Sequence, residues 1–195
     1  MKSDTIAAIA TALSDAGIGI IRISGPEAIA VANRVVVNKK KEHTLKKWQT
    51  HTIHYGFVEE NGTILDEVMV SVMKAPRSYT TEDTVEINCH GGVLLTKRVL
   101  EAVLHSGARM AEPGEFTKRA FLSGRIDLSE AEAVMDLIQA KNQFSMQASI
   151  KQLRGSVAEK VKSLRAALLY EIAFIESALD DPEHISLDGY EEELC

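Results

Sequence analysis

The sequence contains few cysteines, prolines and aromatic residues, and it has no long apolar run. Its two cysteines, Cys89 and Cys195, are far apart and match neither a disulfide framework nor a metal-ligand spacing. No stretch approaches the roughly 20 apolar residues that cross a bilayer. Residues 1–5 do not resemble a signal peptide. We therefore expect a cytoplasmic protein that does not associate with membranes.

Motifs for nucleotide binding and for common catalytic chemistry are also absent. The sequence has no Gly-x-x-x-x-Gly-Lys-Ser/Thr phosphate loop, no Gly-x-Gly-x-x-Gly fingerprint and no Gly-x-Ser-x-Gly nucleophile motif. No His and Cys spacing is typical of a zinc site. The sequence therefore predicts no nucleotide site, no metal and no catalytic residue within this chain.

The chain carries no excess of positive charge, because its formal net charge is -6 at pH 7. Binding to nucleic-acid phosphates requires clustered Lys and Arg, so a uniformly basic binding surface is excluded. The basic runs Lys39–Lys41 and Lys46–Lys47 fit either a solvated loop or an RNA-binding patch, and we favour the loop.

The first part of the chain is predicted to be a mixed α+β domain, which we place at residues 1–118. The dipeptide Asn61-Gly62 predicts a tight hairpin, since both residues tolerate positive φ. Apolar runs and alternation predict strands at 5–11, 18–24, 51–59, 63–74 and 84–89, and helices after Pro26, after Gly92 and at 115–122.

The second part, residues 119–195, is predicted to contain helices only. Ser129 and Glu132 have the spacing of a capping box. From Phe144 to Leu179, apolar residues recur at steps of three or four, which predicts one helix of about 35 residues that ends at Asp181-Pro182. One such helix cannot bury its own apolar stripe. We therefore expect the chain to be part of a longer protein or of an oligomer.

Two charged residues interrupt apolar strands and are candidate binding residues. Arg22 is either an exposed charge on an edge strand or a cation that meets an acceptor or an opening. Glu86 is either half of an ion pair or a carboxylate that accepts two parallel hydrogen bonds, for example from the 2-amino group and ring N–H of a pterin.

Two further segments carry weaker signals. At His90-Gly91-Gly92, between a strand and a helix, the glycines either form a plain tight turn or let backbone N–H groups approach a ligand. Arg125 lies between helices and fits either a bidentate contact with a ligand carboxylate or a local ion pair. Asp127 is placed to fix the same turn.

Three ordered blocks of the sequence resemble the MnmE family of tRNA-modification GTPases. The first block comprises residues 4–11 (DTIAAIAT) and 17–25 (GIGIIRISG), and the second comprises residues 78–92 (SYTTEDTVEINCHGG). The third runs from 113–122 (PGEFTKRAFL) through 124–128 (GRIDL) to 130–133 (EAEA), and it is the most diagnostic. The resemblance extends over nearly the whole chain.

The resemblance implies an amino-terminal domain related to the folate-binding fold of glycine-cleavage T-protein, followed by the first half of a helical domain. In such proteins the amino-terminal domain forms a homodimer and binds 5-formyl- or 5,10-methylene-tetrahydrofolate. An inserted domain hydrolyses GTP with Mg²⁺ and K⁺. With the flavoprotein MnmG, the dimer modifies C5 of the wobble uridine in tRNA. The folate contacts of the family map onto Arg22, Glu86 and Arg125.

The chain also departs from the family pattern. Residues 12–17 lack the usual Pro- and Gly-rich loop, and neither a GTPase domain nor a terminal Cys-Ile-Gly-Lys is present. We therefore expect an amino-terminal part of the protein that is not itself catalytic. Two alternatives stay open. The first is a stand-alone folate-dependent aminomethyltransferase that uses His90, Glu115 or Cys89, and the second is a purely structural dimerisation module.

Overall fold

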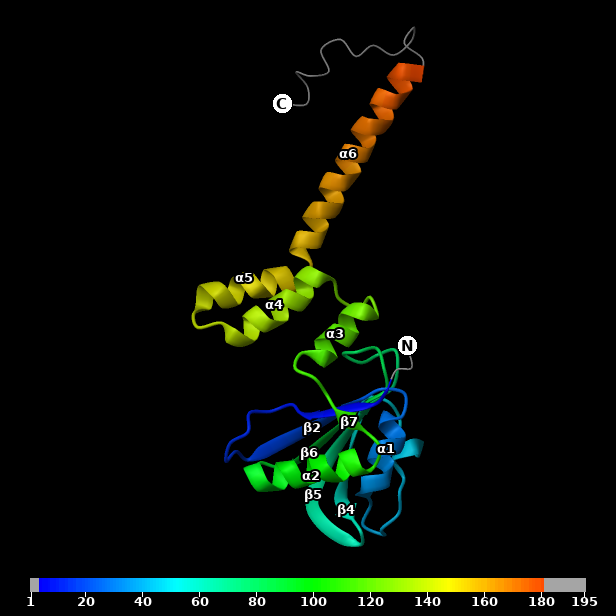
Figure 1. Cartoon of the computed structure of the whole chain (residues 1–195), viewed down its shortest axis with the longest axis vertical. Helices are drawn as coiled ribbons and strands as arrows, with labels where there is room; N and C mark the ends of the chain where they lie inside the picture. Colours follow the sequence, from blue (N-terminus) through cyan, green and yellow to red (C-terminus); the bar gives the residue numbers. More distant parts are fainter. Residues whose placement is uncertain (1–3, 181–195) are drawn as a thin grey trace. The chain divides into compact units, whose positions relative to one another are not determined.

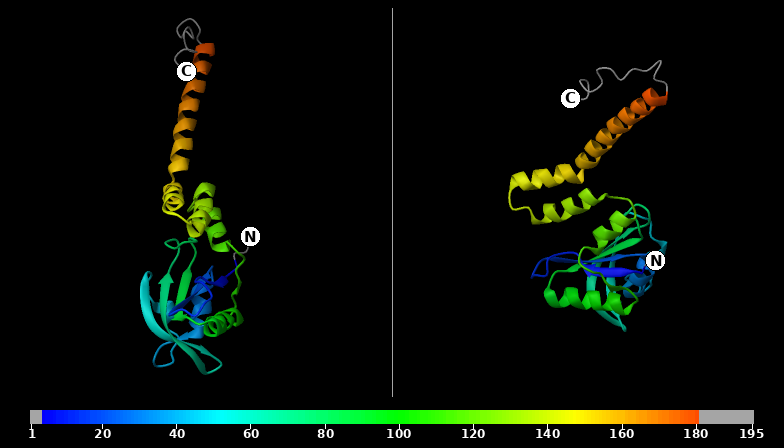
Figure 2. Two further views of the ribbon diagram at one scale, coloured as in Figure 1. Left: turned by 90° about the vertical axis from the view of Figure 1, so that its left-hand side faces the viewer. Right: turned by 45° about the horizontal axis from the view of Figure 1, so that its top comes forward.

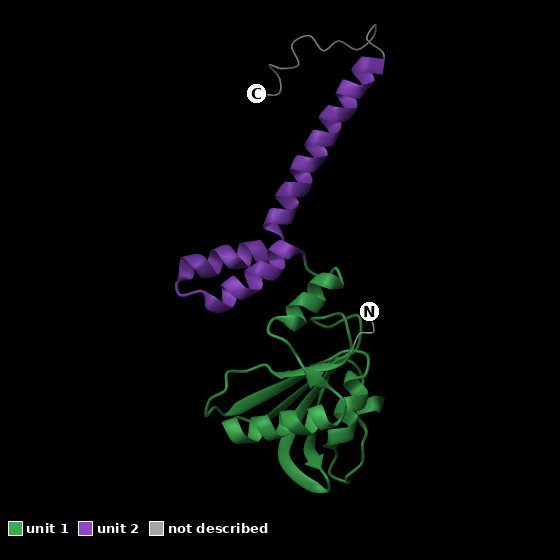
Figure 3. Ribbon diagram, viewed as in Figure 1, with its two compact units in different colours: residues 1–126 green, residues 127–195 purple. Residues whose placement is uncertain are grey.

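A computed structural model describes residues 4–180 of the chain. The chain divides into two compact units, residues 1–126 and residues 127–195 (Figure 3). The boundary predicted after residue 118 lies inside helix α3 (Glu115–Leu122), all of which belongs to the first unit. Ion pairs from Glu115 and Arg119 to Arg109 and Asp4 hold this helix in that unit.

The first unit is built on a seven-stranded sheet with the order β3-β4-β5-β6-β2-β1-β7. Figure 1 shows this sheet with β2, β4, β5, β6 and β7 labelled. All neighbouring strands are antiparallel except β1 and β7, which are parallel. The strands are β1 (Ile6–Ile9), β2 (Ile18–Ser24), β3 (Val36–Val37), β4 (Thr52–Glu60), β5 (Thr63–Met73), β6 (Thr84–His90) and β7 (Arg109–Met110).

Helices α1 (Ala28–Val35) and α2 (Val93–His105) pack on one face of this sheet, as the two views of Figure 2 show. A short 3₁₀ helix, Leu45–Lys47, lies between β3 and β4. Alternate strand residues point towards the helices and form the core, because successive side chains of a strand point to opposite faces. The core includes Ile21, Ile23, Val70, Ile87, Val31, Val99 and Val103.

Most elements predicted for this unit are confirmed. The strand over 18–24 has the predicted bounds, and Asn61 and Gly62 turn the β4–β5 hairpin with φ angles of 51° and 81°. Leu94 on the first turn of α2 is 77% exposed. Lys46 and Lys47 lie on the 3₁₀ helix and are exposed, in agreement with a solvated segment.

The second unit is helical, with α4 (Leu128–Gln139), α5 (Gln143–Leu153) and α6 (Ser156–Asp180). The single long helix predicted from Phe144 is wrong. The chain breaks between α5 and α6 at Gly155, whose φ of 79° is left-handed and ends a helix. The predicted ending at Asp181-Pro182 lies outside the described residues, as does Cys195.

The predicted capping box at Ser129 and Glu132 is wrong by two positions. Asp127 is the N-cap of α4. Its side chain accepts a hydrogen bond from the backbone N–H of Glu130, and the Glu130 carboxylate accepts one from the backbone N–H of Asp127. The reciprocal bonds satisfy two N–H groups that the helix leaves unpaired. Asp127 therefore fixes the turn before α4, as the sequence suggested. Within residues 4–180, no helix is long and apolar enough to span a membrane.

Candidate functional site

The structure brings Arg22 and Glu86 together on the sheet face opposite α1 and α2. The two residues are directly paired across β2 and β6, so their side chains share one face. Strand β2 lies between β6 and β1, which means that Arg22 is not on an edge strand. The sequence-based interpretation of Arg22 as an exposed edge charge is therefore wrong, and its acceptor is Glu86.

The ion pair uses only part of each group's hydrogen-bonding capacity. Arg22 Nε donates to Glu86 Oε1 over 2.8 Å, and the side chains are 32% and 22% exposed. Within residues 4–180, this is the one hydrogen bond of either side chain, and Glu86 Oε2 has no donor. The Arg22 guanidinium lies 5.6 Å from the centre of the Phe116 ring in α3. The pair therefore leaves a carboxylate oxygen and several N–H groups available to a planar polar ligand.

Arg125 is not bonded to this pair. Its Nη1 donates to the backbone oxygen of Tyr79 over 2.9 Å, and its guanidinium lies 5.1 Å from the centre of the Tyr79 ring. The Tyr79 hydroxyl in turn shares a 3.0 Å hydrogen bond with Thr117 of α3, the residue after Phe116. Arg125 is exposed, so its remaining N–H groups can reach a ligand carboxylate from solvent.

The segment His90-Gly91-Gly92 is held by contacts within the protein. Both the backbone N–H and Nδ1 of His90 bond to Asp66 over 2.8 Å, and the Asp66 hydrogen bond raises the pKa of His90 above its ordinary value. A Cβ atom at Gly91 would lie 2.1 Å from the carbonyl oxygen of Ala16, whereas one at Gly92 would meet no atom within 4 Å. Gly91 is therefore required by the loop that precedes β2.

This difference between the glycines gives a paired stability prediction. Gly91→Ser is expected to lower the free energy of unfolding by about 1–3 kcal/mol, because the Ala16 backbone must move to admit the side chain. Gly92→Ser should be neutral or slightly stabilising, since Gly92 is the N-cap of α2 and serine is a better N-cap residue. Urea unfolding of both variants measures the difference. Equal stability would contradict the close approach.

A stand-alone transferase would need a nucleophile or a base, but Cys89 and Glu115 are both held in forms that do not suit these roles. Cys89 is buried and its thiol donates to the backbone oxygen of Gly19, while burial raises its pKa and disfavours the reactive thiolate. Glu115 is engaged by two arginines, as described below. These contacts weigh against the aminomethyltransferase alternative.

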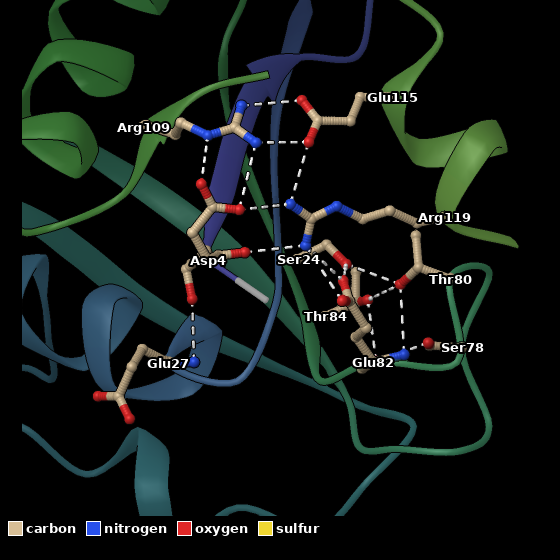
Figure 4. A network of polar contacts seen from close by, with 11 residues as sticks. Asp4, Ser24, Glu27, Ser78, Thr80, Glu82, Thr84, Arg109, Glu115 and Arg119 are labelled. Atoms are coloured by element: carbon tan, nitrogen blue, oxygen red, sulfur yellow. Dashed lines mark hydrogen bonds and ion pairs between the residues drawn. The ribbon is translucent and has the colours of Figure 1, made fainter. Parts of the chain in front are cut away.

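Sequence reasoning missed a network of five charged side chains next to α3 (Figure 4). Its members are Asp4, Glu82, Arg109, Glu115 and Arg119. Arg109 holds both oxygens of Glu115, with N–O distances of 2.6 and 2.9 Å. Arg119 contacts both oxygens of Glu82 at 3.1 Å, Asp4 at 2.9 Å and Glu115 at 3.0 Å. The network links the segment before β1, residues 78–84 between β5 and the first residue of β6 (the 78–84 loop), β7 and α3.

Burial and mutual pairing set the protonation of this network. The hydrogen bond from Arg109 lowers the pKa of Glu115 to about 2, aided by the backbone N–H of Glu112 and by Arg119, against the opposing effect of burial. Hydrogen bonds from Arg109 also lower the pKa of Asp4. The pKa of Arg109 is raised, chiefly by Glu115. Asp4, Arg109 and Glu115 therefore stay ionised at neutral pH, and Glu115 is not available as a general base.

No group of three or more His, Cys, Asp or Glu side chains within residues 4–180 is arranged to hold a metal ion.

Comparison with known families accounts for both units. Residues 5–125 match the family described as the GTP-binding protein TrmE N-terminus. The chain belongs to the MnmE (TrmE) family. Residues 128–194 match the MnmE helical domain, and the two matches meet where the structure divides, after Ile126.

Curated MnmE relatives are similar over nearly the whole chain. A relative from Lachnoclostridium phytofermentans is 59% identical over 194 residues, which cover 100% of this chain and 42% of the relative. Relatives from Listeria welshimeri and Carboxydothermus hydrogenoformans are each 52% identical, covering 94% of this chain and 40% of their own length. All three are named tRNA modification GTPase MnmE. The chain thus spans about two fifths of the MnmE relatives it matches.

Proposed function

We propose that this chain is the folate-binding, dimerising part of a GTPase that modifies C5 of the wobble uridine of tRNA together with the flavoprotein MnmG. The names of its relatives support the tRNA and GTPase parts of this proposal. GTP, Mg²⁺ and K⁺ would be used by the whole protein, since this sequence has no phosphate loop. We also propose a cytoplasmic location and a relation of the sheet unit to glycine-cleavage T-protein.

The half-used Arg22–Glu86 pair is the observation that supports a folate most directly. Glu86 Oε2 can accept from the amidine edge of a pterin, whose amino group and ring N–H are donors. Arg22 and the exposed Arg125 then suit the carboxylates of the folate tail or the end that carries the one-carbon unit. The Phe116 ring beside Arg22 offers an apolar surface for the pterin plane.

Titration calorimetry tests the proposal. 5-Formyltetrahydrofolate should bind the chain, whereas p-aminobenzoylglutamate, which has the carboxylates but no pterin, should bind at least tenfold more weakly, because it leaves Glu86 without its donors. Equal binding of the two compounds would remove Glu86 from the pterin role. Absence of binding to either, from a folded dimer, would favour the purely structural alternative.

Dimerisation is supported by the apolar side chains that the chain exposes. Helix α6 carries Val161, Leu164, Leu168 and Leu179 with exposed fractions between 54% and 70%. An apolar surface of this kind is typical of a protein interface. Sedimentation equilibrium at the concentration used for calorimetry measures the oligomeric state directly.

A further inference from the structure

The charged network is adjacent in sequence to the residues that contact the candidate cations. Tyr79 lies in the 78–84 loop, which also contains Glu82, and its carbonyl oxygen accepts from Arg125. Phe116 lies in α3 between Glu115 and Arg119, and its ring lies beside Arg22. Glu82 and Arg119 form an ion pair. Glu82 thus lies on the same loop as Tyr79, and Arg119 lies on the same helix as Phe116.

On the loop side, Glu82 is fixed by its neighbours. Ser24 at the end of β2 donates to Glu82 Oε2 over 2.8 Å, and the same hydroxyl lies 2.7 Å from that of Thr80. The Ser78 hydroxyl donates to the backbone oxygen of Glu82 over 2.6 Å. Ser78 and Thr80 flank Tyr79 and are both buried. Because these contacts join Glu82 to the residues on both sides of Tyr79, a displacement of Glu82 also displaces the Tyr79 backbone.

On the helix side, Glu115 and Arg119 lie one turn apart on the same face of α3. Glu115 is clamped by Arg109 of β7, which ties the beginning of the helix to the sheet. Arg119 is only 12% exposed and reaches from the helix to Glu82. Its planar guanidinium can hold several carboxylates at once, which a lysine ammonium at the same position does less well.

We propose that Arg119 is a positioning residue of the candidate folate site, because its bridge from Glu115 to Glu82 fixes the separation between α3 and the 78–84 loop. The Tyr79–Thr117 hydrogen bond joins the same two elements, so Tyr79 keeps its place only while that separation is held. Through Tyr79 the bridge orients Arg125, and through α3 it sets the Phe116 ring against Arg22. The inference rests on the proposed folate-binding function.

The experiment combines a ligand-free measurement with a binding measurement. The chain has four tyrosines, so incorporation of tyrosine labelled with ¹³C at the hydroxyl-bearing carbon gives few resonances, and Tyr79→Phe assigns the one of interest. Arg119→Gln and Glu82→Gln should each shift the Tyr79 resonance and weaken 5-formyltetrahydrofolate binding roughly tenfold, a common effect of losing an outer positioning group. The double variant should be no worse than Arg119→Gln alone, because that substitution already removes the bridge to Glu82.

Two controls separate positioning from general effects. Arg98→Gln removes an exposed arginine from α2 and should leave binding and the Tyr79 resonance unchanged. Val103→Ala lowers stability through the core and should affect binding only through the unfolded fraction. An unchanged Tyr79 resonance in Arg119→Gln, or a loss of affinity no larger than in Val103→Ala, would overturn the proposal. If the unaltered chain binds no folate, the proposed function fails, and the ligand-free resonance still decides whether Arg119 positions Tyr79.

Discussion

Glu86→Gln is expected to weaken binding of 5-formyltetrahydrofolate about 100-fold. The substitution keeps the shape of the side chain, yet it removes the charge that two parallel N–H donors of the pterin require. Hydrogen bonds to a charged group contribute about 1.5–3 kcal/mol each, and a 100-fold change corresponds to about 2.7 kcal/mol. The loss of the ion pair with Arg22 adds to the effect, because the guanidinium then faces a neutral amide oxygen in place of a carboxylate. Calorimetric titration measures the change.

Glu67→Gln provides the matched control. Glu67 lies on β5, is exposed, and accepts a hydrogen bond from the Tyr55 hydroxyl, so it is a carboxylate of the same sheet that takes no part in the Arg22 pair. Its replacement should leave folate affinity within twofold. Retention of full affinity by Glu86→Gln, with both proteins folded, would show that the ion pair is only structural.

Glu115→Gln is expected to lower the free energy of unfolding by about 3 kcal/mol at pH 7. The pKa of Glu115 is about 2, below the ordinary value of 4.5, because Arg109 and Arg119 stabilise the ionised form. A carboxyl group with a lowered pKa contributes stability above its unfolded-state pKa, and this contribution is lost as the pH falls towards the folded-state pKa. The difference between the two proteins should therefore shrink by more than half at pH 3.

Urea unfolding followed by fluorescence measures this effect, since Trp48 is the one tryptophan of the chain and lies in the sheet unit. Glu101→Gln is the control, because its partner Arg98 lies 3.4 Å away on the exposed side of α2. Exposed pairs of this kind contribute at most about 1 kcal/mol. A difference between Glu115→Gln and the unaltered chain that stays constant from pH 7 to pH 3 would contradict the lowered pKa.

Local patterns were sufficient to predict most of the sheet unit from the sequence. The alternation around Arg22 and around Glu86 placed two strands with nearly correct ends, and Asn61-Gly62 placed the hairpin. The helical part was less predictable, because the apolar spacing continues across Gly155 and hides the break. A glycine inside a periodic stretch was the signal that should have interrupted the predicted helix.

For the candidate site, too, some features could be predicted from the sequence and others could not. Arg22 and Glu86 stood out because each is a charge within an apolar strand, but their pairing depends on strand register, which no local pattern reveals. In the network, Glu115 and Arg119 are spaced four residues apart on one helix, and this spacing was available in the sequence. Asp4 and Arg109 meet only because β1 and β7 pair in parallel at the edge of the sheet, which requires the complete topology.

The strand order also bears on how the molecule folds. Strands β4, β5 and β6 follow one another in both chain and sheet, and the β4–β5 turn closes over two residues. Arg22 and Glu86, by contrast, are 64 residues apart, and joining them closes a long loop at a higher entropic cost. The antiparallel strands β4, β5 and β6 should therefore pair with one another before β2 pairs with β6. Until then, Glu86 lies apart from Arg22, so the candidate site is assembled in one of the later steps of folding.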